Sequence, residues 1–435
     1  MAQFRTDLKI LDGAHNRTRY EVMMLNDRLT TSGSLTDAFG RLRTSMPFTL
    51  FDSQHRYKEN DKFDTLIVGG AANTQYKINE SAIDMNVGTA SGDKVIRESK
   101  RVFAYQPGKS LLIMSTFAMS TPKANLRQRV GYFGNNNGIY LEANGTVISL
   151  VERSYSNGSL VETVVPQSSW NIDKFDGAGL SAQMSVAGNH GGGLLVNKTN
   201  IFWIDMEWLG VGDVRCGFVV DGAMYPAHIF HHDNVANTTY MTTAVLPIRY
   251  EIENLNTTAS SSTLKQICST VVSEGGYQGR NKSRAQATDF GNFKTLTTAN
   301  TYYPVMSIRL NPDRPDAVVL PKNFDLAVIT NQTATLHYKI LINASLANAS
   351  FANCQGNTVQ YDVSANSSST GGTLIKTGFI STSQKGAAID LGSIEEFEIQ
   401  LGRTISGNSD IFSVFVASET SGAQIGSSIE WYELI

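Results

Sequence analysis

The stretch from Ile201 to Gly222, IFWIDMEWLGVGDVRCGFVVDG, constrains the fold more than any other part of the sequence. Every second residue from Phe202 to Trp208 is apolar, and the same is true from Val214 to Val220, which is the pattern of two half-buried strands. The glycines between the two runs supply the positive φ angles of a tight reversal. A hairpin alone is only marginally stable, so we expect this one at the middle of a β-sandwich.

Turn signals divide much of the chain into short strand-like runs. Asn-Gly pairs at 137–138, 144–145 and 157–158 predict a meander of antiparallel strands, because both residue types tolerate the positive φ of a type I′ turn. Helical patterns are few, although Tyr20–Leu29 fits one short helix. The sequence therefore predicts an all-β fold whose main part is a jelly-roll-like, concanavalin-like β-sandwich.

The distribution of these runs predicts three parts. Residues 1–55 read as an extended N-terminal arm, 56–290 as the jelly-roll-like sandwich, and 291–435 as a second, smaller β-sandwich. The polar, glycine-bearing stretch 275–298 marks the second boundary. The arm carries apolar side chains with too few apolar neighbours for a core of its own, so it should dock elsewhere. Docking onto its own sandwich and docking onto a neighbouring subunit both fit the pattern.

Composition narrows the classes of partner. The formal net charge is −3, only 17% of residues are charged, and no basic run would follow a phosphate backbone, so we expect no nucleic-acid partner. No run approaches the roughly 18 apolar residues of a membrane helix, and the N-terminus has no secretory pattern. The three widely spaced cysteines are typical of small core residues in a protein made in a reducing compartment.

Two acidic residues in the central stretch are the strongest enzymatic candidates. Asp205 and Glu207 would share one strand face with Cα atoms roughly 6–7 Å apart, and paired carboxylates perform glycoside hydrolysis. The Glu-x-Asp-x-Glu run of laminarinase-type jelly rolls has Trp203 at its first acidic position here, so the nucleophile is missing. The favoured alternative is a cross-strand ion pair between Glu207 and Arg215. We predict no enzymatic activity.

A histidine cluster and several aromatic residues are the remaining candidates for binding chemistry. His228 with His232, or His231 with Asp233, could supply metal ligands, but neighbouring residues of a strand point to opposite faces, so we predict no metal and no cofactor. Aromatic rings can stack on sugars, although they also fill sandwich cores. The candidates for stacking are Tyr132, Tyr140, Trp170 and Trp203.

The segment Ala38–Ser53, AFGRLRTSMPFTLFDS, resembles a known signature. Its Gly-Arg-Leu-Arg run, the Ser-x-Pro that follows and Thr-Leu-Phe-Asp-Ser are similar to the N-terminal signature of virion structural proteins from marine tailed bacteriophages, cyanophages among them. Similar blocks follow at 170–177 (WNIDKFDG) and 202–212 (FWIDMEWLGVG), so the resemblance covers about residues 38 to 275.

The resemblance implies a non-enzymatic virion component of the tail, tail fibre or baseplate, made in the host cytoplasm. Its expected partners are other virion proteins and further copies of itself in a trimer or ring. The alternatives are a module that binds a host surface glycan or receptor, and a capsid-surface decoration protein. The candidate docking residues in the predicted arm are Phe39, Arg41, Leu42, Arg43 and Phe51. The candidate glycan contacts, all at predicted loop tips, are Asn136, His190, Asp233 and Asn234.

Overall fold

The computed structural model describes residues 23–25, 28–30, 44–178, 193–279, 281–329, 334–366, 371–381, 386–391 and 399–434. Within them the secondary structure consists of strands and one short 3₁₀ helix, η1 (Gln167–Ser169), which confirms the all-β class. No helix in this part of the chain is long and apolar enough to cross a bilayer. Internal contacts divide the chain into two units, Met1–Pro47 and Phe48–Ile435.

The first unit contains one small hairpin, in which β1 (Met23–Leu25) pairs antiparallel with β2 (Arg28–Thr30). The short helix predicted over Tyr20–Leu29 is therefore wrong, because so short a segment gains too few helical hydrogen bonds to offset nucleation. Four candidate docking residues lie outside the described residues, namely Phe39, Arg41, Leu42 and Arg43.

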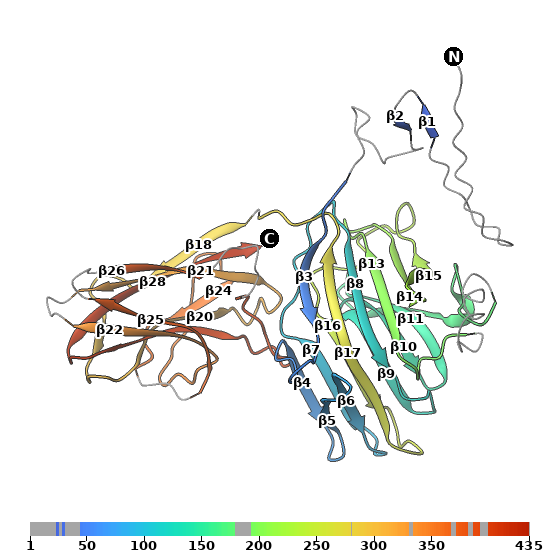
Figure 1. Cartoon of the computed structure of the whole chain (residues 1–435), viewed down its shortest axis with the longest axis horizontal. Coiled ribbons are helices and arrows are strands. Elements are labelled where there is room, and N and C mark those ends of the chain that lie inside the picture. The colour runs from blue at the N-terminus through green and yellow to red at the C-terminus, as the bar shows by residue number, and fades with distance from the viewer. Residues whose placement is uncertain are drawn as a thin grey trace. The chain divides into compact units, whose positions relative to one another are not determined.

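The second unit begins with a sandwich of two antiparallel sheets, drawn as two layers in Figure 1. One sheet has seven strands in the order β12-β11-β10-β9-β16-β7-β4. The strands β9 to β12 are the predicted meander. The bounds are β4 (Phe63–Val68), β7 (Lys94–Ser99), β9 (Leu126–Phe133), β10 (Gly138–Asn144), β11 (Val147–Ser154), β12 (Val161–Pro166) and β16 (Ile248–Asn254).

The facing sheet has eight strands in the order β15-β14-β13-β8-β17-β6-β5, with β3 also paired to β17. The predicted central hairpin is β13–β14, with Ile204 opposite Cys216. It lies toward the β15 edge of this sheet and not at its middle. The bounds are β3 (Phe48–Ser53), β5 (Asn73–Lys77), β6 (Ala82–Val87), β8 (Leu111–Ala118), β13 (Asn200–Met206), β14 (Val214–Val220), β15 (Ala223–Phe230) and β17 (Ser262–Ser273).

Aromatic side chains fill the space between these two sheets. The ring of Phe218 lies 5.5 Å from Phe202 on the neighbouring strand and 5.2 Å from Phe175. Phe175 and Trp170 come from the connection after β12, and both are buried. The block at 170–177 that carries the resemblance is therefore part of the core packing.

Phe51 belongs to this core as well. It lies in β3, is only 4% exposed, and its ring is 4.9 Å from Phe103 and 5.9 Å from Phe63. Residues 48–53, predicted as part of an extended arm, are thus a strand of the eight-stranded sheet. The candidate docking residue Phe51 is a core residue of its own sandwich, where it and its neighbour Leu50 are both buried beside a register shift in the β3–β17 pairing.

A second, smaller sandwich follows. One of its sheets has five strands, ordered β18-β28-β21-β26 with β19 also paired to β28, and the other has six, ordered β23-β24-β20-β27-β22-β25. Because β18 pairs with β28, the second sandwich takes up residues that were predicted in the first. The bounds are β18 (Lys282–Ala287), β19 (Lys294–Leu296), β20 (Tyr303–Leu310), β21 (Val318–Val328), β22 (Thr335–Ile342), β23 (Ala352–Asn353), β24 (Val359–Asp362), β25 (Thr373–Ser381), β26 (Gly386–Asp390), β27 (Ile411–Ser418) and β28 (Ala423–Leu434).

Candidate functional site

The two carboxylates Asp205 and Glu207 neither lie together on one strand nor make the ion pair that the sequence predicts. Asp205 stands opposite Arg215 in the β13–β14 register, and its Oδ2 lies 2.5 Å from a guanidinium nitrogen. Burial raises the pKa of Asp205, and Arg215 partly offsets that rise. Glu207 lies beyond the end of β13 and is exposed. The cross-strand ion pair is therefore present, but Asp205 forms it and the expected partner Glu207 does not.

Several loops meet at the end of the first sandwich where β13 ends. The side chain of Asn137, in the β9–β10 turn, accepts hydrogen bonds from the backbone of Tyr155 (3.2 Å) and Thr242 (3.0 Å). This contact ties the β9–β10 turn to the β11–β12 turn and to the β15–β16 connection. Three candidate glycan-contact residues are exposed on these loops, namely Asn136, Asp233 and Asn234. The fourth candidate, His190, lies outside the described residues.

His232 is a buried polar side chain of this loop end with contacts to three other residues. Its Nδ1 lies 2.8 Å from the carbonyl oxygen of Gly212, and its Nε2 lies 2.7 Å from a carboxylate oxygen of Glu152. The ring stacks on Tyr240 at 3.9 Å with an interplanar angle of 7°. Burial alone would lower the pKa of His232, but Glu152 and the Gly212 carbonyl raise it above its usual value. Both ring nitrogens face acceptors, so the geometry favours the doubly protonated imidazolium.

The other predicted histidines separate. His231 follows the end of β15, and its Nδ1 lies 2.9 Å from a carboxylate oxygen of Asp213. Asp213, His231 and Asp233 offer ligand atoms within 4.8 Å of one another. They are exposed or half-buried, and His231 is already hydrogen-bonded to Asp213, so spacing alone does not define a metal site here. His228 is buried in the sheet and accepts a hydrogen bond from the backbone of Asn171 (3.3 Å), so His228 and His232 do not form a pair.

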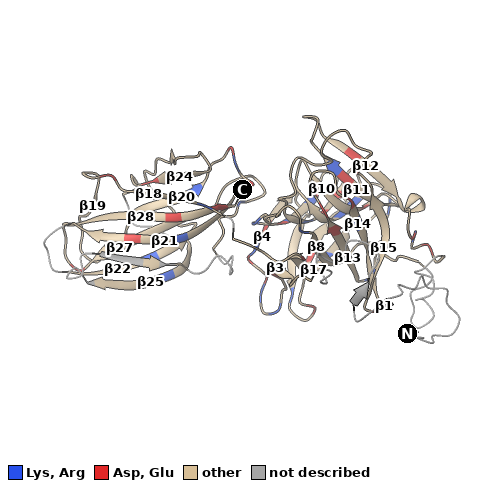
Figure 2. Ribbon diagram, turned by 90° about the horizontal axis from the view of Figure 1, so that it is seen from above, with Lys and Arg blue, Asp and Glu red and all other residues tan. Residues whose placement is uncertain are grey.

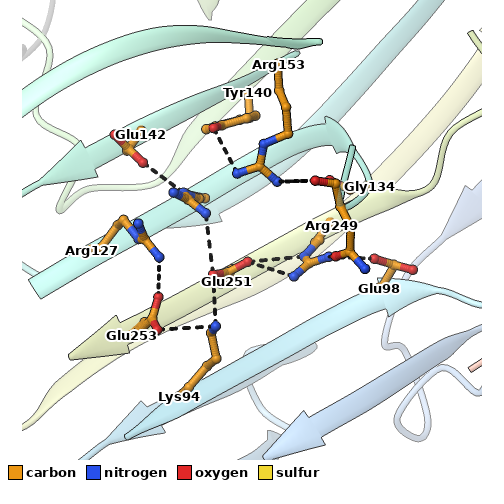
Figure 3. Close-up of polar contacts among 12 residues, drawn as sticks. Lys94, Glu98, Arg127, Gly134, Tyr140, Glu142, Arg153, Arg249, Glu251 and Glu253 are labelled. Atoms are coloured by element: carbon orange, nitrogen blue, oxygen red, sulfur yellow. Dashed lines mark hydrogen bonds and ion pairs between the residues drawn. The ribbon is translucent and has the colours of Figure 1, made fainter. Parts of the chain in front are cut away.

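A second polar region, which we call the charged face, covers the side of the seven-stranded sheet that points away from the core (Figure 3). Arg249, Glu251 and Glu253 point outward along β16, alternating with the core residues Ile248 and Tyr250. Basic and acidic residues also lie next to one another on β11 and β12 (Figure 2). The face consists of Lys94, Glu98, Arg127, Arg129, Glu142, Arg153, Glu162, Arg249, Glu251 and Glu253.

Glu251 lies at the centre of the charged face with a side chain only 3% exposed. Its carboxylate oxygens are 3.0 Å from Arg249, 3.7 Å from Arg129 and 3.7 Å from Lys94. Burial alone would raise the pKa of Glu251, but the neighbouring cations lower it. Every basic residue of the charged face forms an ion pair with a carboxylate of the same face, so an anionic ligand would have to displace an internal carboxylate.

Glu98 extends this network toward the second sandwich. Its carboxylate lies 3.1 Å from Arg249 and 3.0 Å from Arg403. Arg403 belongs to the connection between β26 and β27 of the second sandwich. Burial raises the pKa of Glu98 despite both guanidinium groups. The backbone N–H of Arg403 also donates to the carbonyl of Lys100 at 2.8 Å. The charged face is therefore a structural ion-pair network that reaches residues of both sandwiches. This network is absent from the predictions made from the sequence. The alternation of charged with apolar residues from Arg249 to Glu253 is the sequence signal that could have identified it.

The four aromatic residues proposed for sugar stacking are all buried. Arg153 lies over the Tyr140 ring at 5.1 Å from its centre, and the phenol of Tyr132 donates to the carbonyl of Ala244 at 2.8 Å. Each of the four side chains is at most 4% exposed, so none of them can stack on a sugar. The four residues are Tyr132, Tyr140, Trp170 and Trp203.

Comparison with known proteins identifies no family for this chain. No protein-family model matches the sequence, and no curated protein matches it. Among solved structures, the CBM2 module of the evolved Dit of Lactobacillus casei BL23 phage J-1 is 5% identical over 54% of this chain and 100% of its own, with a TM-score of 0.35. Peanut lectin is 8% identical over 53% of this chain and 98% of its own, with a TM-score of 0.28.

A GH16 protein of the Bacteroides ovatus mixed-linkage glucan locus is 10% identical over 51% of this chain and 99% of its own, with a TM-score of 0.32. At such identities and TM-scores these likenesses do not bear on what this chain does.

Proposed function

We propose that this chain is a bacteriophage virion structural protein, a component of the tail, tail fibre or baseplate that acts by subunit assembly. It is made in the host cytoplasm and becomes part of the particle, next to other virion proteins and further copies of itself. The proposal rests on the signature at Ala38–Ser53 and on the way the fold divides it. Phe48–Ser53 is strand β3 of the sandwich, whereas residues up to Pro47 belong to a separate unit.

This division supports an anchored extension. β3 pairs with β17 over Ser53 to Phe48, and Phe51 fixes it in the core. Met46, two residues before β3, is 83% exposed. A segment fixed at one end to a stable sandwich can reach a neighbouring subunit without loss of the fold. The sequence left open whether the arm docks on its own sandwich or on a neighbouring subunit. Phe51 packs in its own sandwich. Residues 1–47 are the part that we propose to contact a neighbouring subunit.

Deletion of residues 1–47 tests this proposal. We expect the shortened chain to keep the β-type circular dichroism and the unfolding transition of the full chain, because both sandwiches lie in Phe48–Ile435. We expect it to be missing from particles assembled in infected cells that carry tagged subunits. A matched control keeps residues 40–53 and deletes only residues 1–30. Incorporation of the deletion variant at the level of the full chain would contradict the assembly role of this unit.

Glycan binding at the loop end is the second candidate function. The observation that favours it is that the exposed residues Asn136, Asp233 and Asn234 lie on loops that are joined through Asn137. The test is adsorption of the purified chain to host cells, compared with an Asn136→Ala, Asp233→Ala double variant. Equal adsorption of the two proteins would remove this loop end as a receptor site.

A further inference from the structure

An exposed aromatic ring lies on the outer side of the second sandwich. Phe379 of β25 stands opposite His337 of β22, and its neighbour Ile380 stands opposite Leu336. Ile380 and Leu336 belong to the core, so Phe379 and His337 point away from it. Phe379 is 73% exposed, and one face of its ring stacks on His337 at 4.4 Å with an interplanar angle of 28°. The ring is thus fixed on one face and open to solvent on the other.

Hydrogen bonds fix the imidazole beneath this ring. The hydroxyl of Thr377 donates to the carbonyl of Tyr338 at 2.8 Å, so its oxygen can accept from His337 Nε2, 2.9 Å away. The other ring nitrogen, Nδ1, accepts from the hydroxyl of Tyr302. These hydrogen bonds give both nitrogens of a neutral imidazole a partner, with Nδ1 as acceptor and Nε2–H as donor. Burial and the nearby Lys339 lower the pKa of His337, which agrees with the neutral form.

Three polar residues lie on the same face of the sheet as the exposed ring or are bonded to its imidazole partner. The Lys339 ammonium lies 4.0 Å from the centre of the Tyr302 ring, and Thr377 is exposed. The oxygens of Thr377 and Tyr302 keep lone pairs that can accept further hydrogen bonds, and Lys339 keeps protons to donate. We call this group, Tyr302, His337, Lys339, Thr377 and Phe379, the aromatic platform.

We propose that the aromatic platform binds a carbohydrate, with the C–H face of one pyranose ring stacked on Phe379. A sugar ring presents an apolar face and a rim of hydroxyl groups, which matches one exposed ring surrounded by two acceptors and one cation. The site is distinct from the loop end of the first sandwich and does not depend on the assembly role.

Two other occupants fit this surface less well. A second copy pairing along the free side of β25 would meet Lys376, which stands opposite the core residue Ile340, and charged residues at such positions oppose edge pairing. A stable protein interface also buries about 800 Å² per partner, far more than one phenyl ring presents. A nucleic acid is disfavoured because a single lysine cannot neutralise several phosphates.

The test is binding of the full-length chain to immobilised oligosaccharides. The panel contains cello-, manno-, galacto- and N-acetylglucosamine oligomers and purified O-polysaccharides from marine bacteria, and hits are titrated by calorimetry. We expect Phe379→Ala to weaken binding of a hit about tenfold or more, because it removes the stacking surface. We expect Phe379→Trp to keep binding and Thr377→Val to weaken it.

The matched control is Phe290→Ala, which removes a phenyl ring that is 97% exposed in the turn between β18 and β19, away from the platform. This variant should bind like the unmodified chain. A far-ultraviolet circular dichroism spectrum and a thermal unfolding transition equal to those of the unmodified chain show that each variant is folded. The proposal is overturned if no member of the panel binds, or if folded Phe379→Ala binds as tightly as Phe290→Ala. Loss of self-association in Phe379→Ala without loss of glycan binding would instead assign the surface to a second copy.

Discussion

Replacement of Glu251 by glutamine should destabilise the first sandwich by about 3–5 kcal/mol, the usual cost of breaking a buried ion pair. The substitution keeps the shape of the side chain and removes its charge. The carboxylate lies 3.0 Å from Arg249 and 3.7 Å from both Arg129 and Lys94. At an effective dielectric constant of about 20, each of these contacts is worth about 5 kcal/mol before desolvation. Burial of the ions offsets most of that sum, and removing one partner leaves the guanidinium groups buried and under-compensated.

The assay is urea denaturation followed by tryptophan fluorescence, because Trp170, Trp203 and Trp208 all lie in the first sandwich. Glu253→Gln is the matched control. Its side chain is 16% exposed, compared with 3% for Glu251, so we expect a loss of about 1 kcal/mol or less. If Glu251→Gln costs no more than Glu253→Gln, the charged face is not a coupled buried network.

The pH dependence of the free energy of unfolding gives an independent check that the ionised form of Glu251 stabilises the folded state. The folded state lowers the pKa of Glu251, so its contribution is present above the unfolded pKa of about 4.3 and is lost as pH falls through the folded value. The difference in stability between the unmodified chain and Glu251→Gln should therefore be largest near neutral pH and shrink in acid. A difference that grows as the pH falls would refute the reasoning.

Two further substitutions and the two proposals extend these tests. Phe51→Ala should cost about 3–5 kcal/mol in urea denaturation, because it empties a buried ring position between the sheets; a loss below about 1 kcal/mol would show that β3 is not anchored by this ring. The folded state raises the pKa of His232, so its stabilisation should be complete below about pH 6.5 and disappear as pH rises through the folded pKa, a trend that His232→Gln should abolish. Particles should exclude the chain without residues 1–47, and Phe379→Ala should lose glycan binding that Phe290→Ala keeps.

Much of the fold follows from local patterns in the sequence. The alternation on both sides of the Gly210 turn predicts the β13–β14 hairpin, and the Asn-Gly pairs predict the meander from β9 to β12. Such patterns act over a few residues, because side chains alternate along a strand and particular turns need particular residues. They do not fix where a strand lies in its sheet. The sequence therefore places FTLFDS in an arm, whereas the structure shows a strand in which a register shift accompanies the burial of both Leu50 and Phe51.

The sites depended on longer-range pairing. The exposed candidates Asn136, Asp233 and Asn234 lie on two loops that are joined because the backbone of Thr242, in the β15–β16 connection, donates to Asn137 in the β9–β10 turn. Sequence reasoning chose the wrong partner for Arg215, because a difference of two residues in strand register decides between Asp205 and Glu207. It also missed Phe379, whose ring stands opposite His337 from a different strand.

Local patterns in the sequence specify that this chain forms strands, where many of them turn, and which side of many strands is apolar, because these properties arise between near neighbours. Which charges meet and which rings stay open to solvent is set by tertiary packing. Glu251 contacts Arg129, which lies on a strand more than a hundred positions away in sequence. Tyr140 is buried because arginine side chains cover its ring, whereas Phe379 is exposed on β25, an edge strand of its sheet. Those outcomes depend on the order and register of strands that are distant in sequence, which no local pattern specifies.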